Sequence, residues 1–163
     1  MLDRENQILE ILQEDARIAP EQIAVMIGES EETVRETIVA LEQRGVLLKY
    51  MAVINQEQMG TENVRALIEV RVTPQREKGF DEIARRIVQF EEVKSLFLMS
   101  GAYDLMVMVE APTLKQLALF VSDKLSTLEN VTGTATHFML KTYKSDGVLF
   151  ESPRDDRRLA VSP

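Results

Sequence analysis

The apolar residues of the first 45 positions recur every three or four residues, the spacing of helices that bury one face. They predict a helix over about residues 3–14 with Asp3 as its N-cap, a short helix that begins at Pro20, and a third helix capped by Ser30. Gly45 is expected to end the third helix, because glycine adopts the left-handed conformation of a tight helix exit at little cost.

A glycine turn joins the second and third predicted helices. Ala24 lets the third helix cross closely, Gly28 makes the sharp turn, and Val34 continues the apolar stripe of the third helix. This spacing is typical of a helix-turn-helix, whose second helix enters a DNA major groove. The apolar segment over residues 46–54 predicts a β-hairpin, which would form a wing. A three-helix interaction domain is the alternative on this pattern.

The second half of the chain predicts an α+β domain. Residues 55–63 are polar and lack periodicity, so we place a linker there. Alternating and continuous apolar runs then predict strands over 64–72, 93–99, 105–109 and 131–143, with helices over 80–88 and 113–128. The order β-α-β-β-α-β predicts a ferredoxin-like fold with both helices on one face of an antiparallel sheet. The other face needs a cover, and a second subunit would supply it for apolar side chains such as those of Val64–Val72.

Composition removes several classes of chemistry. The chain of 163 residues is 45% hydrophobic, contains no cysteine and has one histidine, His137. Disulfides, thiolate nucleophiles, zinc fingers and iron–sulfur clusters are therefore excluded, and no metal site is expected. Neither a signal peptide nor an apolar run of about 20 residues is present, so we expect a soluble, cytoplasmic protein.

Charge is unevenly distributed along the chain. The net charge is −8, and residues 1–60 hold twelve acidic but only five basic residues, whereas the remainder is nearly balanced. This asymmetry indicates two units and argues against a broad basic surface for nucleic acid. We expect a DNA-binding domain over 1–54, the linker over 55–63, an effector and oligomerisation domain over 64–143, and a C-terminal extension over 144–163. Within the extension, residues 148–150 are expected to add a strand to a neighbouring subunit.

Several motifs point to one family. Leu2–Leu9 is similar to its opening pattern LDxxDxxIL, although one position shorter and with Asn6 in place of the second acid, and Leu41–Leu47 is similar to LExxGxI. Tyr50 and Asn55 match the following wing, and Ser100–Leu105 contains SGxYD. Over residues 2–145 the chain resembles the leucine-responsive regulator/asparagine regulator (Lrp/AsnC, feast/famine) transcription factors. The resemblance implies a winged helix-turn-helix and a RAM domain, dimers that assemble into octamers, and an amino-acid effector bound between RAM domains.

The predicted DNA-reading helix departs from the family in being acidic. We expect DNA contacts from residues of this helix, from a cation at its end and from one in the predicted wing: Ser30, Glu32, Thr33, Arg35, Glu36, Arg44 and Lys49. Arg35, Arg44 and Lys49 are the expected phosphate contacts, with Arg17 as a further candidate. Glu31 and Glu32 stand in the first turn, where one is expected to offset the helix dipole, while the role of the other, such as accepting a bond from cytosine, stays open.

The SGxYD loop is the candidate effector site. Asp104 would hold the ammonium of a free amino acid, the backbone N–H groups of Ser100, Gly101 and Ala102 would hold its carboxylate, and Tyr103 would form a wall. Gly101 would let a ligand approach the main chain closely. Thr134 and Thr136 on the last strand would add hydroxyl groups, from the same or a neighbouring subunit. A plain turn in which Asp104 bonds its own backbone is the alternative.

Two other functions remain open. Sirohaem decarboxylases, which are enzymes that bind a tetrapyrrole, resemble the same family, and His137 would be the candidate residue for that role. A DNA-silent subunit that only binds an effector would suit the acidic N-terminal part. We expect no catalytic residue and no cofactor beyond the effector, since no carboxylate pair is spaced for acid–base chemistry.

Overall fold

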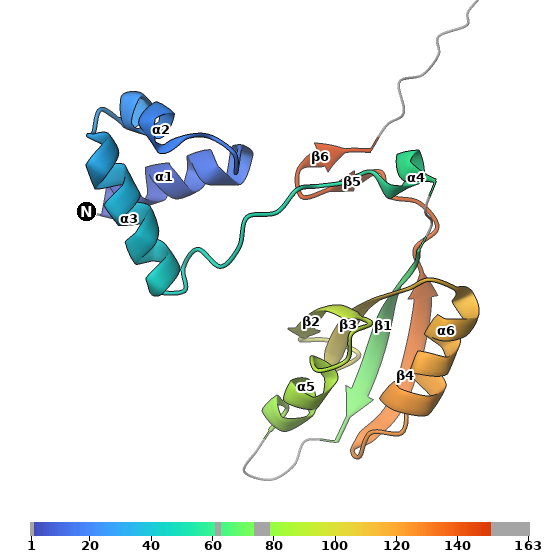
Figure 1. The fold of residues 1–163 in the computed structure, drawn as a ribbon. Coiled ribbons are helices and arrows are strands. Elements are labelled where there is room, and N and C mark those ends of the chain that lie inside the picture. Colours follow the sequence, from blue (N-terminus) through green and yellow to red (C-terminus); the bar gives the residue numbers. More distant parts are fainter. Residues whose placement is uncertain (1, 61–62, 74–78, 151–163) are drawn as a thin grey trace, which may run out of the picture. The chain divides into compact units, whose positions relative to one another are not determined.

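A computed structural model of the protein describes residues 2–60, 63–73 and 79–150. The chain forms two compact units that divide between Ile54 and Asn55 (Figure 1). Each unit has a hydrophobic core of its own. None of the helices in the described part is long and apolar enough to cross a membrane.

Three helices form the N-terminal unit: α1 (Leu2–Glu14), α2 (Pro20–Ile27) and α3 (Glu31–Gln43). Their apolar stripes meet in a small buried core of Ile8, Leu12, Ile23, Ala24 and Val34. Gly28 takes a left-handed φ of 72° between α2 and α3. The predicted helix-turn-helix is therefore confirmed.

The helix ends follow their sequence signals with one exception. Pro20 is the first residue of α2, and the Ser30 hydroxyl accepts a hydrogen bond from the Thr33 N–H at 3.1 Å, which caps α3. Gly45 has a φ of 67° directly after α3. The prediction that Asp3 caps α1 is wrong, because the helix already begins at Leu2. Asp3 lies in the first turn, where its charge is still favourable toward the helix dipole.

Residues 46–54 form no strand, so the prediction of a hairpin wing is wrong. A two-residue hairpin turn needs residues with positive φ, such as Asn-Gly, and none of residues 46–54 has a positive φ. The segment therefore leaves α3 as irregular chain, with apolar side chains such as Leu48 exposed (85%). Tyr50 is tied back to α3, since its hydroxyl donates to Glu42 Oε1 at 3.0 Å.

Four antiparallel strands form the sheet of the C-terminal unit, in the order β2-β3-β1-β4. The strands are β1 (Val64–Val72), β2 (Val93–Leu98), β3 (Leu105–Ala111) and β4 (Val131–Phe138). The helices are the short α4 (Gln56–Met59) before β1, α5 (Asp81–Ile87) between β1 and β2, and α6 (Leu114–Leu119) with the π-helical turn η1 (Phe120–Leu125) between β3 and β4. This order and topology confirm the ferredoxin-like fold.

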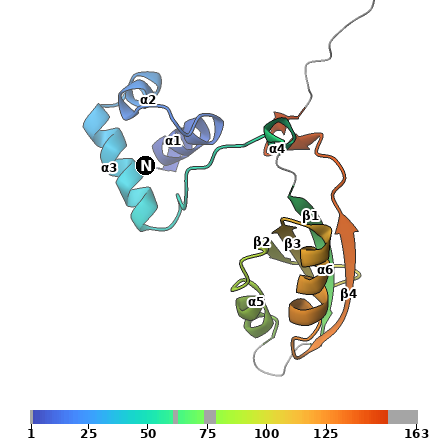
Figure 2. The ribbon, with the colours of Figure 1, turned by 45° about the vertical axis from the view of Figure 1, so that its right-hand side comes forward.

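The core of this unit lies between the sheet and helices α5 and α6, which cover one side of it (Figure 2). Every second residue of β1 and β3 is buried there, together with Ile83, Ile87, Leu117, Phe120 and Leu125. The rings of Phe90 and Phe120 meet edge to face with their centroids 5.5 Å apart. The alternating apolar residues of the strands and the apolar residues at helical spacing in α5 and α6 thus pack into one shared core.

The opposite face of the sheet has no cover within the described residues. The expectation that the apolar side chains of β1 need a partner was wrong in detail, because Ala66, Ile68, Val70 and Val72 pack under the helices. The alternate positions form the open face instead. Cross-strand pairing aligns Phe97 with Met106 and Leu67 with Met108, which makes an apolar patch in which Phe97 is 50% exposed.

Strand β4 ends five residues earlier than predicted. Its last pairs are Phe138 with Ala66 and the bond from Met139 N–H to the Arg65 carbonyl, and β1 begins just beyond, at Val64, so no partner remains. The chain then turns back as a small hairpin of β5 (Lys144–Ser145) and β6 (Val148–Leu149).

The hairpin pairs β6 with β5 within the chain and leaves the other edge of β6 unpaired among the described residues, so the expectation that residues 148–150 add a strand to a neighbouring subunit stays a prediction. Asp146 and Gly147 at its turn have φ of 49° and 82°. Two consecutive positive φ values are typical of the type I′ turn, which favours an Asp-Gly pair. The rest of the predicted C-terminal extension, residues 151–163, lies outside the described residues.

Candidate DNA-binding and effector sites

Helix α3 presents one face to the core and the opposite face to solvent. Val34, Thr37 and Leu41 are buried. Glu32, Glu36, Val39 and Gln43 are exposed, and their spacing of four, three and four residues aligns them along the outer face. Ser30 and Thr33 lie at the start of the helix, where their hydroxyl groups are 2.8 Å apart. The residues expected to contact DNA thus divide between a capping group and an outer stripe.

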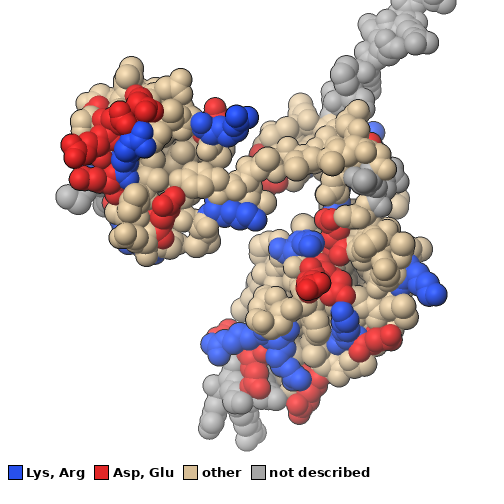
Figure 3. Space-filling view, in the orientation of Figure 1, with Lys and Arg blue, Asp and Glu red and all other residues tan. Residues whose placement is uncertain are grey.

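Arg35, the one basic residue of α3, is held between two carboxylates. Its Nε donates to Glu31 Oε1 at 2.6 Å, and its Nη2 donates to Glu21 Oε1 of α2 at 3.1 Å. The hydrogen bond and the charge of Glu31, followed by the charge of Glu21, raise the pKa of Arg35 above its usual value. Figure 3 shows acidic side chains gathered over α2 and the beginning of α3, with basic side chains among them.

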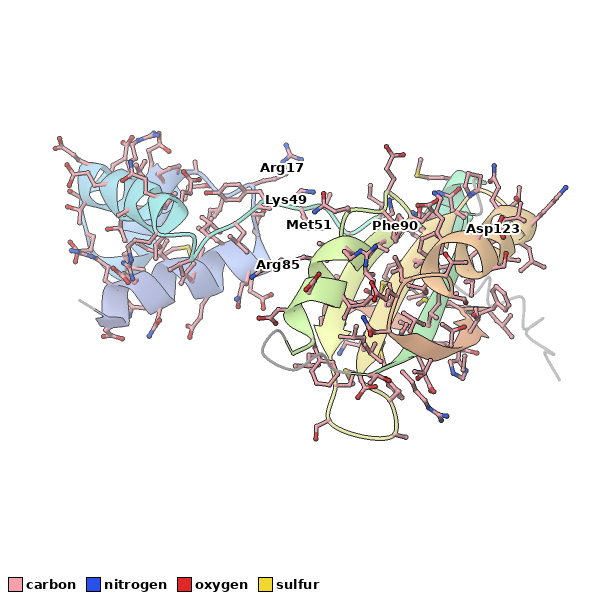
Figure 4. The ribbon with its side chains drawn as sticks, turned by 90° about the horizontal axis from the view of Figure 1, so that it is seen from below. Arg17, Lys49, Met51, Arg85, Phe90 and Asp123 are labelled. Carbon is pink, nitrogen blue, oxygen red and sulfur yellow. The ribbon has the colours of Figure 1, made fainter. Side chains whose placement is uncertain are left out.

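The other cations of this unit divide into paired and unpaired groups. Arg44 donates to Glu5 at 2.8 Å and Arg4 donates to Glu29 at 3.4 Å. The side chains of Arg17 and Lys49 have no ion pair within the described part of the chain and extend away from the helices (Figure 4). Of the residues expected to contact phosphates, Lys49 and the further candidate Arg17 are therefore available without breaking a pair, whereas Arg35 and Arg44 must exchange a carboxylate for the phosphate.

The SGxYD loop connects β2 to β3 at one end of the sheet. Ser100, Gly101 and Ala102 are exposed, and Tyr103 is half-buried. A Cβ added to Gly101 would meet no atom within 4 Å, so the backbone is open to a close approach from outside. These placements leave the loop accessible to a ligand.

Asp104 is anchored in the sheet. Its Oδ2 accepts the Val72 N–H at 2.8 Å, its own N–H donates to the Val70 carbonyl at 3.1 Å, and its carbonyl accepts the Met99 N–H at 2.8 Å. The side chain therefore bonds the backbone of β1 rather than its own turn. Sequence alone could not identify this partner, because it depends on how β1 and β3 align.

Thr134 and Thr136 lie on β4, and β1 separates them from Asp104. They pair with Val70 and Ile68, whose side chains face the helices. The Thr134 hydroxyl is 3.4 Å from the hydroxyl of Ser126. Both threonines therefore sit on the helix-covered side of the sheet, apart from the loop with which they were grouped.

His137 lies on the open face of the sheet, aligned with Leu67 of β1. Its Nε2 is 3.1 Å from Glu69 Oε1, and the imidazole is exposed. Among the described residues, no cluster of three or more histidine, aspartate or glutamate side chains is arranged to hold a metal ion.

A groove of about 480 Å³ lies at the other end of β3, lined in part by Glu92, Glu110, Phe120 and Lys124. Lys124 donates to Glu92 at 2.6 Å and lies 5.8 and 5.9 Å from the ring centroids of Phe90 and Phe120. Partial burial alone would raise the pKa of Glu92, but the bond from Lys124, a backbone hydrogen bond and the charges of Lys124 and Lys94 hold it below the usual value. No sequence motif marks this groove, because its residues converge from separate elements.

Both units match families of known proteins. Residues 3–42 match the AsnC-type helix-turn-helix domain, and residues 65–149 match the Lrp/AsnC ligand binding domain. The chain belongs to the Lrp/AsnC family. It is 48% identical over its whole length to the Bacillus subtilis protein named as an uncharacterized HTH-type transcriptional regulator, YugG, of which 99% is covered. It is 32% identical to the HTH-type regulator LrpA of Pyrococcus horikoshii, with 87% of this chain and 98% of the relative covered.

Solved structures of Lrp/AsnC regulators share the fold. The leucine response regulatory protein of Mycobacterium tuberculosis superposes with a TM-score of 0.74 at 26% identity, over 88% of this chain and 95% of that one. A Neisseria meningitidis regulator, solved as an L-Met complex, gives a TM-score of 0.71 at 22% identity, over 87% and 91%. The chain is thus a transcriptional regulator of the Lrp/AsnC type and not an enzyme, so the tetrapyrrole alternative for His137 has no support.

Proposed function

We propose that this Lrp/AsnC protein is an amino-acid-responsive regulator that controls genes of amino-acid metabolism from the cytoplasm. The observation that carries the proposal is the combination on one chain of a helix-turn-helix, whose second helix has a free outer face, with a domain of the Lrp/AsnC ligand-binding type. One unit would bind the operator, and the other would sense the effector.

On the DNA side, residues 30–43 form the proposed reading surface. The outer face of α3 carries Glu32 and Glu36, and Arg35 stands beside it. The outer side chains of α3 would contact bases and make DNA binding specific. Exchange of the exposed ion pairs of Arg35 for a phosphate would make it sensitive to salt.

On the effector side, we assign the loop Ser100–Asp104 to a free amino acid. The exposed backbone of the loop offers donors for a carboxylate, and Asp104 offers a negative charge for an ammonium. The L-Met complex of the Neisseria meningitidis regulator supports an amino acid as the class of ligand. Thr134 and Thr136 would contribute only from a neighbouring subunit that places the helix-covered side of its β4 edge near the loop, because within one chain β1 stands between them and Asp104.

The proposal includes a homodimer that builds into a larger ring, which we expect to be an octamer. The open face of the sheet supports this arrangement, because Leu67, Phe97, Met106 and Met108 form an apolar patch that the described residues leave uncovered. Several weak DNA-binding units on one ring would also act at a high effective concentration along one operator.

A mobility-shift assay at low salt tests the function. The DNA is the region upstream of the protein's own gene, and each free amino acid is added in turn. We expect a shifted complex whose affinity or size changes with at least one amino acid. A complex whose affinity and size change with none of the amino acids would contradict the sensing role. If no protein–DNA complex formed while calorimetry still showed an amino acid bound, the result would favour a DNA-silent effector subunit.

A further inference from the structure

The outer face of α3 has an unusual chemical composition for a helix that contacts DNA. Glu32, Glu36, Val39 and Gln43 form its central stripe, without a lysine or arginine. Arginine and lysine recognise guanine, through its O6 and N7 acceptors. A stripe of carboxylate, apolar and amide side chains instead suits bases that present an amino group or a methyl group.

Glu36 is the residue of this stripe that the stability of the helix does not explain. Glu31 pairs with Arg35, and Glu32 lies in the first turn, where its charge offsets the helix dipole. Glu36 lies beyond the first turn and has no ion pair within the described part of the chain. It also stands four residues after Glu32, a spacing at which like charges repel each other.

We infer that Glu36 is a specificity-determining residue that accepts a hydrogen bond from the N4 amino group of cytosine in the operator. This inference rests on the proposed function, in which α3 enters the major groove. The carboxylate is an acceptor only, so it pairs with the amino group of cytosine and is repelled by the acceptors of guanine and by O4 of thymine.

Val39 extends the inference to a neighbouring base. Its side chain is 48% exposed and lies three residues after Glu36, about 4.5 Å further along the helix axis. Successive base pairs are about 3.4 Å apart, so Val39 reaches a position one or two base pairs from the cytosine. An apolar side chain there contacts the methyl group of thymine. The operator is therefore expected to contain a cytosine and a thymine within this distance.

The test selects bound sequences from a library of random double-stranded DNA with the full-length protein. Wild type, Glu36→Gln and Glu36→Ala are compared, with Glu10→Gln as a control that removes the same charge from the exposed surface of α1. Because every variant removes a negative charge, affinity for each selected sequence is divided by affinity for random DNA. All four proteins are first compared by circular dichroism.

We expect wild type and Glu10→Gln to select the same cytosine, roughly 5- to 150-fold over guanine at that position. Glu36→Ala should lose this preference, and Glu36→Gln should move it toward adenine, which glutamine recognises through N6 and N7. A cytosine preference that survives in Glu36→Ala would overturn the inference while leaving DNA binding intact. Failure of the wild-type protein to bind any DNA would instead overturn the proposed function on which it rests.

Discussion

Arg35 illustrates how one side chain is balanced between two sets of partners. Within the protein it bonds Glu31 and Glu21, both exposed. On DNA it would bond a phosphate. We predict that Arg35→Ala weakens operator binding by roughly tenfold or more, because a charge-assisted bond is lost and two carboxylates are left without their cation. The fold should stay as stable as that of wild type, since both ion pairs are exposed. Fluorescence anisotropy and thermal melting measure the two effects. Arg85→Ala, which removes an exposed cation of α5, serves as the control. If Arg35→Ala bound the operator with the same affinity as wild type, the surface that contacts DNA would lie elsewhere.

Asp104 has both a structural and a proposed binding role, and asparagine separates them. In the wild-type protein the Val72 N–H donates to Asp104 Oδ2 at 2.8 Å. Asp104→Asn keeps an oxygen that can accept this hydrogen bond but removes the charge that would hold an ammonium. We predict that the variant keeps its fold and its DNA affinity without ligand but loses the response to amino acids. Calorimetric titration with the free amino acids decides this, with Asp146→Asn in the β5–β6 turn as the control. Equal heats for Asp104→Asn and wild type would place the site elsewhere.

At the scale of elements, the start of α3 depends on its cap. The Ser30 hydroxyl satisfies the Thr33 N–H, which has no partner inside the helix. We predict that Ser30→Ala lowers the free energy of unfolding by about 1 kcal/mol and that Ser30→Asp, which restores an acceptor, does not. Urea denaturation followed by circular dichroism measures the difference. A Ser30→Ala protein as stable as wild type would mean that solvent replaces the cap.

The ion pair between Lys124 of η1 and Glu92 before β2 should make stability depend on pH. The pKa of Glu92 is lowered in the folded protein, so the pair stabilises the fold fully above the ordinary glutamate pKa of about 4.3, and this contribution is lost as the pH falls through the lower folded pKa. We predict that Lys124→Met lowers the free energy of unfolding at pH 7 by less than about 1 kcal/mol. This difference from wild type should disappear in acid. Lys115→Met, on the exposed side of α6, should show no such change with pH. If the difference in free energy of unfolding between Lys124→Met and wild type stayed constant down to pH 3, the ion pair would not be its source.

Sequence periodicity predicted those elements whose stability is local or whose apolar face is buried. The three helices of the N-terminal unit and the β-α-β-β-α-β order are examples. The segment over 46–54 has the apolar pattern of strands but lacks a turn, and β4 has apolar residues beyond the point where β1 runs out. Pairing decides where a strand ends, and pairing depends on the alignment of distant segments.

The same limit applies to the candidate sites. Ser30 as a cap followed from local spacing, whereas the bonds of Arg44 to Glu5 and of Asp104 to Val72 join residues far apart in the sequence. Such contacts decide whether a cation is available to DNA or a carboxylate to a ligand. The composition of α3 and the i,i+4 spacing of Glu31 and Arg35 were visible in the sequence, but the second bond of Arg35, to Glu21, depends on the arrangement of α2 beside α3.

At the scale of the whole molecule, the open face of the sheet should decide assembly. Met108 lies near its centre, aligned with Leu67 on one side and Ser95 on the other. We predict that Met108→Glu dissociates the oligomer, because a carboxylate in an apolar interface loses its hydration without gaining a partner. Light scattering at micromolar concentration measures the particle mass, with Val25→Glu on the exposed surface of α2 as the control. A wild-type particle of 18.5 kDa would contradict the assembly itself.

The carboxylates that pair with Arg4, Arg35 and Arg44 also affect how the regulator is distributed between its operator and nonspecific DNA. Sequence-independent attraction comes from counterions that free cations displace from the phosphates, and this unit offers few free cations. On the proposed function, we therefore expect the many competing sites of a genome to sequester only a small fraction of the molecules. Most copies should then reach the operator by three-dimensional diffusion rather than by sliding, so that its occupancy follows the number of copies that the cell makes.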